Sequence, residues 1–238
     1  TGADSGIGRA VALAYAREGA DVAVSFLSEG DEADRTRALI EAAGQRALLL
    51  PGDIQSADHC RDIVARTADQ FGRLDILVNN AAHQMHFDTF EDIPDEEWEV
   101  TFRTNIFSMF YLSKAAVPLM KQGGSIINTA SVNSDMPNPG LLAYASTKGA
   151  IQNFSAGLAQ SLGPRGIRVN CVAPGPVWTP LIPATLPAES VANFGANYPM
   201  GRPAQPAELA SAYVMLADPA SSYTSGATIA VTGGKPII

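Results

Sequence analysis

Short apolar runs alternate with amphipathic segments along the whole chain. The runs are rich in β-branched residues with mostly consecutive apolar positions, typical of strands buried on both faces; we expect strands at residues 21–27, 46–54, 74–80, 125–131, 167–175 and 227–234. Between them, apolar residues recur at helical spacing and predict helices at residues 7–18, 31–43, 57–71, 96–120, 144–162 and 206–216. This alternation predicts one α/β domain over residues 1–238, a doubly wound parallel sheet with helices on both faces.

Two segments interrupt this alternation, at residues 82–95 and 176–206. The second is long and carries six prolines before Pro206. Long irregular segments inside a compact domain are usually functional. We therefore expect the segment at about 176–206 to bind the substrate.

Composition and charge narrow the classes of function. The 238 residues include 16 basic and 24 acidic side chains, which give a net charge of −8. Nucleic-acid binding needs a basic face, so nucleic acid is not an expected partner. No apolar run approaches the ~20 residues of a membrane span, so no membrane partner is expected either. The two isolated thiols, Cys60 and Cys171, fit a reducing, cytoplasmic compartment and have no metal-site spacing.

A glycine-rich loop leads directly into the first predicted helix. Residues 1–8 read Thr-Gly-Ala-Asp-Ser-Gly-Ile-Gly. Glycines let the backbone turn tightly and approach a pyrophosphate, whose charge then lies on the N–H groups at the start of the helix. Three glycines before a helix can also form a plain tight turn, but the alternation of strands and helices favours the nucleotide site.

Further polar residues follow at defined distances. Residues 79–82 read Asn-Asn-Ala-Ala at a predicted strand end, and Tyr144 and Lys148 form a Tyr-x3-Lys pair. Ser131 lies thirteen residues before the tyrosine at another strand end, and Asn105 lies inside a predicted helix. Each feature has an ordinary structural explanation when it is taken alone. Their order and spacing together are much more specific.

A last motif, Pro174-Gly175 with Thr179 beyond it, ends the fifth predicted strand. With the glycine loop and the polar residues above, it resembles the short-chain dehydrogenase/reductase family over the full length of the chain. The segment 172–180 and the ending 231–236 are most similar to the bacterial glucose/ribitol dehydrogenase-like NAD(P)-dependent oxidoreductases. Ala82 departs from the family's Asn-Asn-Ala-Gly pattern.

The resemblance implies a Rossmann fold and an NAD(P)-dependent oxidoreductase that interconverts a ketone or aldehyde and an alcohol by hydride transfer. The catalytic residues implied are Asn105, Ser131, Tyr144 and Lys148. The residues implied to contact the cofactor are Gly2, Ser5, Gly6, Ile7, Gly8, Asp53, Ile54, Asn80, Ala81, Tyr144, Lys148, Pro174, Gly175, Val177 and Thr179. No metal is implied.

Individual roles also follow from the resemblance. Lys148 holds the nicotinamide ribose, Asn105 positions a water that relays the proton, and Asp53 contacts adenine. From the residues alone, Asn105 could equally bridge backbone groups and Asp53 could be an ordinary turn residue.

The chemistry explains why Tyr144 and Lys148 would occur together. Hydride transfer at a carbon must be matched by proton transfer at its oxygen, and a free tyrosine with a pKa near ~10 is a poor base at neutral pH. Lys148 lies one helical turn away on the same face. We expect its ammonium to lower the pKa of Tyr144, which would serve as general acid/base. Ser131 would donate a hydrogen bond to the substrate oxygen.

The preference between NAD and NADP depends on the second strand of the family fold. An NAD enzyme places an acid at its end for the ribose 2′-OH, but residues 24–28 read Val-Ser-Phe-Leu-Ser and Glu29 comes slightly late. Ser5 stands where many NADP-dependent members carry Arg or Lys. The candidates for holding a 2′-phosphate are Ser25, Ser28 and, less well placed, Arg9. We favour NADP and leave use of both cofactors open.

The substrate pocket is expected between residues 82–87, 131–141 and 176–199. Its expected lining is largely apolar and suits a small-molecule ketone, aldehyde or secondary alcohol: Met136, Trp178, Leu181 and Ile182. His83 and His86 lie near this pocket without ligand spacing and either line it or lie on the surface. The helix at 206–216 and the last strand resemble the family's tetramer interface, so we expect a homotetramer.

Other classes remain as alternatives. A non-catalytic nicotinamide-binding sensor or regulatory protein would have a degraded active set, whereas Ser131, Tyr144 and Lys148 are all present. An epimerase of related fold usually carries a longer C-terminal domain. An enoyl reductase would separate the tyrosine and lysine by six residues, and here three intervene.

One expectation concerns the start of the chain. In the family fold a central strand precedes the glycine loop, and none stands before Thr1. Its loss would leave unpaired backbone groups in the core. We therefore expect the natural chain to extend upstream by a strand of about six residues.

Overall fold

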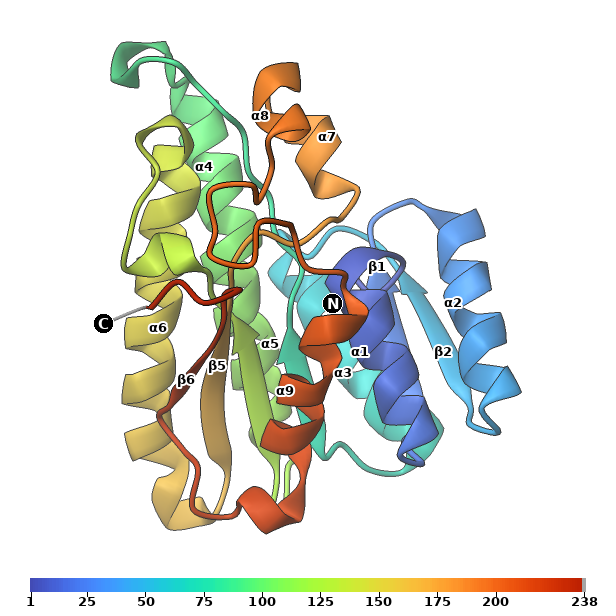
Figure 1. Ribbon diagram of the computed structural model, residues 1–238. Coiled ribbons are helices and arrows are strands. Elements are labelled where there is room, and N and C mark those ends of the chain that lie inside the picture. The colour runs from blue at the N-terminus through green and yellow to red at the C-terminus, as the bar shows by residue number, and fades with distance from the viewer. Residues whose placement is uncertain (237–238) are drawn as a thin grey trace.

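The computed structural model describes residues 1–236 and confirms the predicted order of strands and helices (Figure 1). The strands are β1 (Val22–Phe26), β2 (Ala47–Pro51), β3 (Ile76–Asn79), β4 (Ser125–Thr129), β5 (Arg168–Pro174) and β6 (Thr228–Val231). The helices are α1 (Gly6–Arg17), α2 (Gly30–Ala42), α3 (Ala57–Phe71), α4 (Asp95–Phe102), α5 (Ser108–Ala116), α6 (Leu142–Leu162), α7 (Leu181–Thr185), α8 (Ala188–Ala192) and α9 (Ala207–Ala217). Each predicted strand contains one observed strand.

Every strand pair in residues 1–236 is parallel, as the consecutive apolar runs predicted. β1 pairs with β2, and a second group has the order β3-β4-β5-β6. The first residues of the chain bridge the two groups, because the Thr1 amino group donates to the Val78 carbonyl and the Ala3 N–H to the Ser25 carbonyl. Below this bridge lies a slot of about 480 Å³ lined by side chains of α1, α3, β1 and β3.

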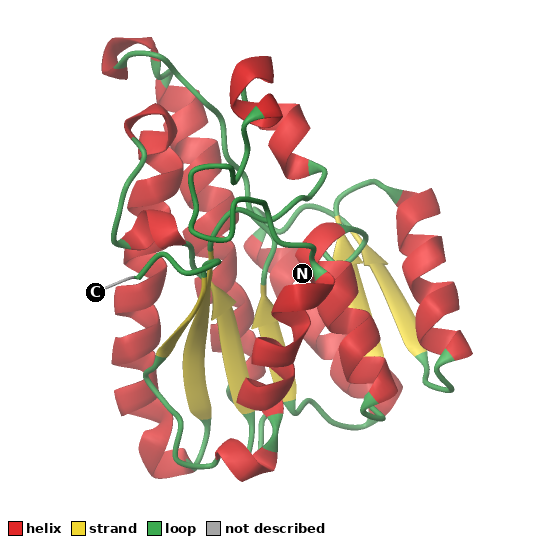
Figure 2. Ribbon diagram, viewed as in Figure 1, coloured by secondary structure: helices red, strands yellow, loops and turns green. Residues whose placement is uncertain are grey.

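Helices cover both faces of the strands (Figure 2). On one face α1 and α9 pack together over β4 and β5 through a core that includes Val11, Tyr213 and Leu216. On the other face α3, α5 and α6 enclose a core that includes Cys60 and Leu112. This is the doubly wound α/β arrangement expected from the alternation.

One predicted helix differs from expectation. Residues 96–120 form α4 and α5 joined by a π-helical turn, Arg103–Phe107, instead of a single regular helix. A π turn inserts one extra residue into the helical ladder and often occurs at functional sites. Asn105 lies within it, and its side chain is tied to a loop outside the helix, which local spacing does not reveal.

The two irregular segments carry short elements. Residues 82–95 contain a single 3₁₀ turn, Phe90–Asp92, and residues 176–206 contain α7 and α8, which lie above the carboxyl ends of the strands (Figure 1). Across residues 1–236, no helix is long and apolar enough to cross a membrane. The same residues contain no group of His, Cys, Asp and Glu side chains arranged to hold a metal ion.

Candidate active site

A cavity of about 1170 Å³ opens at the carboxyl ends of the strands, beneath α7 and α8. In parallel α/β sheets, ligands bind in the crevice at this edge. Of the catalytic and cofactor-contacting residues that the resemblance implies, all except Gly8 and Asn105 line this cavity. The fold therefore brings together residues from both ends of the chain.

The glycine loop forms one wall of the cavity. Gly2 and Gly6 have positive φ values of 58° and 51°, a conformation that glycine adopts without a steric penalty. Ser5 precedes α1 and its side chain makes no capping hydrogen bond, so the N–H groups of the first turn remain available to an anion.

Gly8 packs against the glycine loop itself. It lies outside the cavity lining, and a Cβ at this position would be 2.0 Å from the Gly2 carbonyl oxygen. The absence of a side chain lets α1 approach the loop closely. Asn80 holds the same loop from the other side, since its Nδ2 donates to the Thr1 carbonyl at 3.1 Å.

The far end of the cavity is bordered by the ends of β1 and β2. Asp53 lines it, and its carboxylate accepts hydrogen bonds from the Gln55 backbone and side chain at 2.9 and 3.2 Å. The Ser25 hydroxyl, a candidate for binding a phosphate, is buried without a hydrogen-bond partner among the described residues. Glu29 lines the cavity, whereas Ser28 does not.

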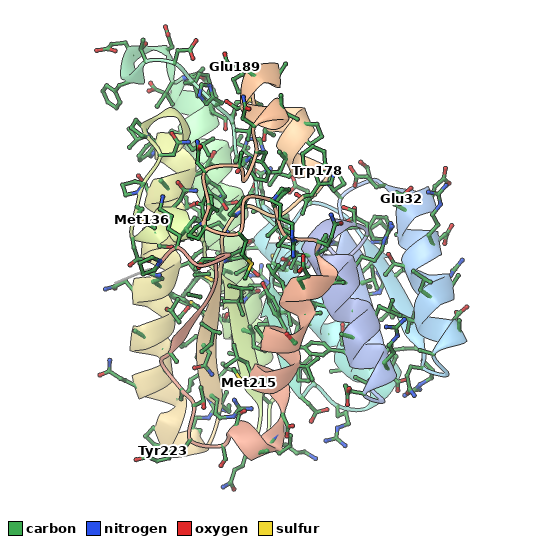
Figure 3. The ribbon with its side chains drawn as sticks, in the orientation of Figure 1. Glu32, Met136, Trp178, Glu189, Met215 and Tyr223 are labelled. Carbon is green, nitrogen blue, oxygen red and sulfur yellow. The ribbon has the colours of Figure 1, made fainter. Side chains whose placement is uncertain are left out.

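Arg9 is poorly placed for an anion in the cavity. Its guanidinium forms an ion pair with Glu32 and also donates to the carbonyl oxygens of Asp4 and Glu32. Its Nε donates to the Thr36 hydroxyl at 2.9 Å. Figure 3 shows Glu32 at the upper end of α2.

Tyr144 and Lys148 lie one turn apart on α6, as their spacing predicted. The Lys148 side chain is only 2% exposed, and its Nζ donates to the Thr129 carbonyl at 2.7 Å. The same Nζ lies 5.2 Å from the centre of the Tyr144 ring. The ammonium therefore faces the aromatic ring and the end of β4.

Burial changes the expected protonation of this pair. It raises the pKa of Tyr144 to about 12, against a smaller lowering by a hydrogen bond with Ser131. It also lowers the pKa of Lys148 to about 8. The net pKa of Tyr144 in the free protein is thus raised and not lowered, because loss of water around the phenol outweighs the groups that favour the phenolate. Tyr144 is a protonated phenol at neutral pH.

Ser131 lies directly beyond β4 and is 5% exposed. Its hydroxyl oxygen accepts hydrogen bonds from the Asn133 backbone N–H at 3.1 Å and side-chain Nδ2 at 3.4 Å. With these donors on the oxygen, the hydroxyl proton points away from Asn133 and toward Tyr144, with which Ser131 shares a hydrogen bond.

Asn105 acts through its neighbours and does not line the cavity. Its Oδ1 accepts from the His83 N–H at 2.7 Å, and its Nδ2 donates to the His83 carbonyl at 2.9 Å and the Thr147 hydroxyl at 3.0 Å. Thr147 in turn donates to the Tyr144 carbonyl at 2.7 Å. Asn105 thus joins the loop after β3 to the helix that carries Tyr144.

Some lining residues differ from those predicted. Met136, Leu181 and Ile182 line the cavity, but Trp178 does not. The Trp178 ring packs on the lining residue Phe194, with centroids 6.3 Å apart. Figure 3 shows Trp178 on the strand-to-α7 segment. His83 and His86 both line the cavity.

No signal in the sequence identifies the partners of two lining residues, His83 and Gln84. His83 contacts Glu97 on α4, and Gln84 contacts Thr185 on α7. Neither spacing is periodic, so only the folded chain reveals these pairs.

Comparison with known proteins agrees with this geometry. A family model described as Enoyl-(Acyl carrier protein) reductase matches residues 2–235. The chain is 54% identical over 235 residues to the uncharacterized oxidoreductase YhdF of Bacillus subtilis. The aligned region covers 99% of this chain and 81% of that protein.

Two plant relatives have more specific names. NADPH-dependent aldehyde reductase 1 of Arabidopsis thaliana is 46% identical over 244 residues, covering 100% of this chain and 85% of that protein. The glucose and ribitol dehydrogenase of Daucus carota is 46% identical over 240 residues, with 98% and 82% covered. The resemblance to the glucose/ribitol dehydrogenase group is confirmed.

Solved structures share the fold. A short-chain dehydrogenase from Burkholderia cenocepacia in complex with NADP superposes with a TM-score of 0.92 at 32% identity, covering 98% of this chain and 94% of that one. The 3-ketoacyl-(acyl-carrier-protein) reductase of Brucella melitensis complexed with NADH gives a TM-score of 0.88 at 30% identity, with 98% and 95% covered. The chain belongs to the short-chain dehydrogenase/reductase family of oxidoreductases.

Proposed function

We propose that the protein interconverts a small-molecule aldehyde or ketone and the corresponding alcohol, with Tyr144 as general acid/base. The main support is the Tyr144 phenol in the strand-end cavity. Like any tyrosine it is protonated at neutral pH, and burial raises its pKa further; a protonated phenol can supply the proton that a carbonyl oxygen needs during reduction.

A bound nicotinamide supplies or accepts the hydride. The glycine loop and the α1 N-terminus are suited to hold its pyrophosphate. The residues suited to hold the nicotinamide end are Pro174, Gly175, Val177 and Thr179. Asp53 and Ile54 border the adenosine end, and Asn80 and Ala81 lie between.

Side chains of the protein bind the substrate oxygen, transfer the proton and stabilise the phenolate. Ser131 donates a hydrogen bond to the substrate oxygen and Tyr144 transfers the proton to it. Lys148 places a positive charge under the tyrosine ring, which stabilises the phenolate left after that transfer. Asn105 is a positioning residue, because its side-chain amide contacts His83 and Thr147 and does not border the cavity. A proton-relaying water beside it remains part of this proposal.

We propose NADP as the preferred cofactor, with NAD accepted. The named relative from Arabidopsis and the Burkholderia structure support NADP, and the Brucella structure shows that a related protein binds NADH. Glu29, which follows β1 and lines the cavity, is an acid that would oppose a 2′-phosphate. The ratio of kcat/KM for NADPH over NADH measures the preference; a clear excess for NADH would refute it.

The deciding experiment is turnover of a panel of aldehydes and ketones by wild type and Tyr144→Phe. The variant removes only the phenolic hydroxyl, so we expect kcat to fall by roughly 10² to 10⁴ with cofactor binding retained. Tyr111→Phe is the matched control, since Tyr111 lies on α5 outside the cavity lining. Full activity of Tyr144→Phe would show that another group transfers the proton.

Two alternatives give different results. A nicotinamide-binding sensor would bind cofactor but reduce no carbonyl compound. Enoyl reduction, suggested by the description of the family model, would appear as NADPH oxidation with a conjugated enoyl thioester; the single turn between Tyr144 and Lys148 favours carbonyl reduction.

We also propose a homotetramer in the cytoplasm. The assembly would use α9, whose Met215 is 42% exposed, together with β6. A monomer by light scattering at micromolar concentration would refute it. The free, buried thiols of Cys60 and Cys171 support a reducing compartment.

A further inference from the structure

Two neighbouring polar residues of the cavity, His83 and Gln84, have no part in hydride or proton transfer. Both follow β3 and line the cavity. Gln84 is only 4% exposed, so its amide must find its partners inside the protein or in the cavity.

Glu97 fixes the orientation of His83. The imidazole Nε2 lies 2.7 Å from Glu97 Oε1, which also accepts a hydrogen bond from the Thr101 hydroxyl at 3.0 Å. A carboxylate is an acceptor only, so Nε2 carries the proton and donates it. In the neutral imidazole Nδ1 is then an acceptor, and no residue in the described chain donates to it.

Thr185 fixes the orientation of the Gln84 amide in a similar way. The Thr185 hydroxyl already donates to the Leu181 carbonyl at 2.7 Å. It must therefore accept from Gln84, whose Nε2 lies 2.8 Å away. The Gln84 Oε1 consequently lies on the other side of the amide, and no residue within 1–236 donates to it.

These two residues are close to the catalytic tyrosine. Asn105 binds both the N–H and the carbonyl of His83, and its Nδ2 contacts Thr147, whose hydroxyl donates to the Tyr144 carbonyl. Three consecutive hydrogen bonds thus connect His83 with Tyr144. A substrate carbonyl at Tyr144 would therefore share one cavity with His83 and Gln84, because all three residues line it.

We propose that His83 Nδ1 and Gln84 Oε1 accept hydrogen bonds from hydroxyl groups of the substrate, and that the substrate is therefore a hydroxylated aldehyde or ketone. Two adjacent acceptors need donors from the ligand, and hydroxyl groups next to a carbonyl supply them. The inference rests on the proposed carbonyl reduction and specifies its substrate class.

The charges of the cavity agree with a neutral ligand of this kind. Asp4, Glu29 and Asp53 line it, and no arginine does so in the part of the chain that the structure describes. The lining includes two lysines. The Lys148 ammonium donates a hydrogen bond to the Thr129 carbonyl, and the Lys235 ammonium lies 5.1 Å from the centre of the Tyr198 ring. The cavity therefore offers acceptors for a polyhydroxy compound and no paired cations for a carboxylate.

The experiment compares matched substrates that differ only in hydroxyl groups: glyceraldehyde with propanal, and erythrose with butanal. For each enzyme the measured quantity is the ratio of kcat/KM for the hydroxylated over the plain aldehyde. Comparing this ratio between variants and wild type cancels the different intrinsic reactivities of the aldehydes. The variants are His83→Phe and Gln84→Met, which keep the size of each side chain but remove its acceptor.

We expect each variant to lower the ratio about tenfold, the effect of one lost hydrogen bond, with kcat/KM for propanal changed less than about threefold. Retained propanal turnover shows that the variants fold and keep Tyr144 in place. His59→Phe is the matched control, since His59 is not among the cavity-lining residues, and it should leave the ratio unchanged.

The outcomes separate the two proposals. Turnover of the plain aldehydes with an unchanged ratio in both variants would overturn the assignment of His83 and Gln84 but leave carbonyl reduction standing. No turnover of any aldehyde or ketone by the wild type would overturn the proposed function and this inference with it.

Discussion

Replacing Lys148 by methionine should abolish turnover and nevertheless stabilise the cofactor-free protein at neutral pH. The lysine is 2% exposed and burial lowers its pKa from 10.5 to about 8. At pH 7 it is charged in both the folded and the unfolded chain, so folding must remove a charged ammonium from water. Methionine fills much of the same space without that charge.

The magnitude follows from the pKa. At 1.36 kcal/mol for each pH unit, the lowered pKa corresponds to about 3 kcal/mol of stability lost by keeping the lysine charged. The variant also removes the donor to the Thr129 carbonyl, which costs about 1–2 kcal/mol. We therefore expect the free energy of unfolding at pH 7 to rise by about 1–2 kcal/mol.

The pH dependence has a definite sign. The penalty is fully present below about pH 8 and disappears as the pH rises from about 8 to 10.5, because the folded lysine releases its proton before the unfolded one does. The advantage of the variant over wild type should shrink across that interval and reverse at its upper end, where only the lost hydrogen bond remains.

Urea denaturation of wild type and Lys148→Met at pH 7 and pH 10, without cofactor, measures both effects. Lys121→Met is the control, because Lys121 is exposed and its replacement should change stability by less than about 0.5 kcal/mol at either pH. A Lys148→Met protein that is less stable than wild type by the same margin at both pH values would refute the reasoning.

Two further predictions concern the cofactor side of the cavity. Gly8→Ala should lower the free energy of unfolding by about 1–3 kcal/mol, because the new Cβ would lie 2.0 Å from the Gly2 carbonyl; Gly157→Ala on α6, where a Cβ meets no atom within 4 Å, should instead stabilise by about 0.5–1 kcal/mol. Thermal unfolding of the two variants distinguishes the close packing at Gly8 from a general effect of alanine in a helix. An equal change in stability in the two variants would contradict the proposed packing role of Gly8. Glu29→Gln should raise NADPH affinity relative to NADH by about 0.3–1 kcal/mol, since it removes a carboxylate at the β1 end of the cavity. Fluorescence titration with both cofactors measures it, and an unchanged ratio would place the 2′-phosphate elsewhere.

Much of the fold could be predicted because its determinants are local. Strands buried on both faces require consecutive apolar residues, and helices between them require apolar residues at helical spacing. Each range predicted from these patterns contains one observed strand. In β4 and β5 every residue is buried. The spacing of Tyr144 and Lys148 was likewise decisive, since four residues correspond to one turn of any α-helix.

Features that depend on distant contacts could not be predicted in this way. The π turn at Asn105 is associated with bonds to His83 and Thr147, 22 and 42 residues away. Trp178 was expected in the substrate pocket, but it packs on Phe194 instead. The pairs His83–Glu97 and Gln84–Thr185 join three separate elements of the chain.

The sequence by itself determined the order of strands and helices and the placement of Tyr144 and Lys148 on one helical face, because period and spacing are properties of a single segment. Only the tertiary structure decided the pKa shifts of these two residues. Their pKa values depend on how much water the surrounding chain removes, and that burial raises the pKa of Tyr144 and lowers that of Lys148. The tertiary structure also decided which side chains line the cavity, since the cavity walls come from segments that meet only in the folded chain.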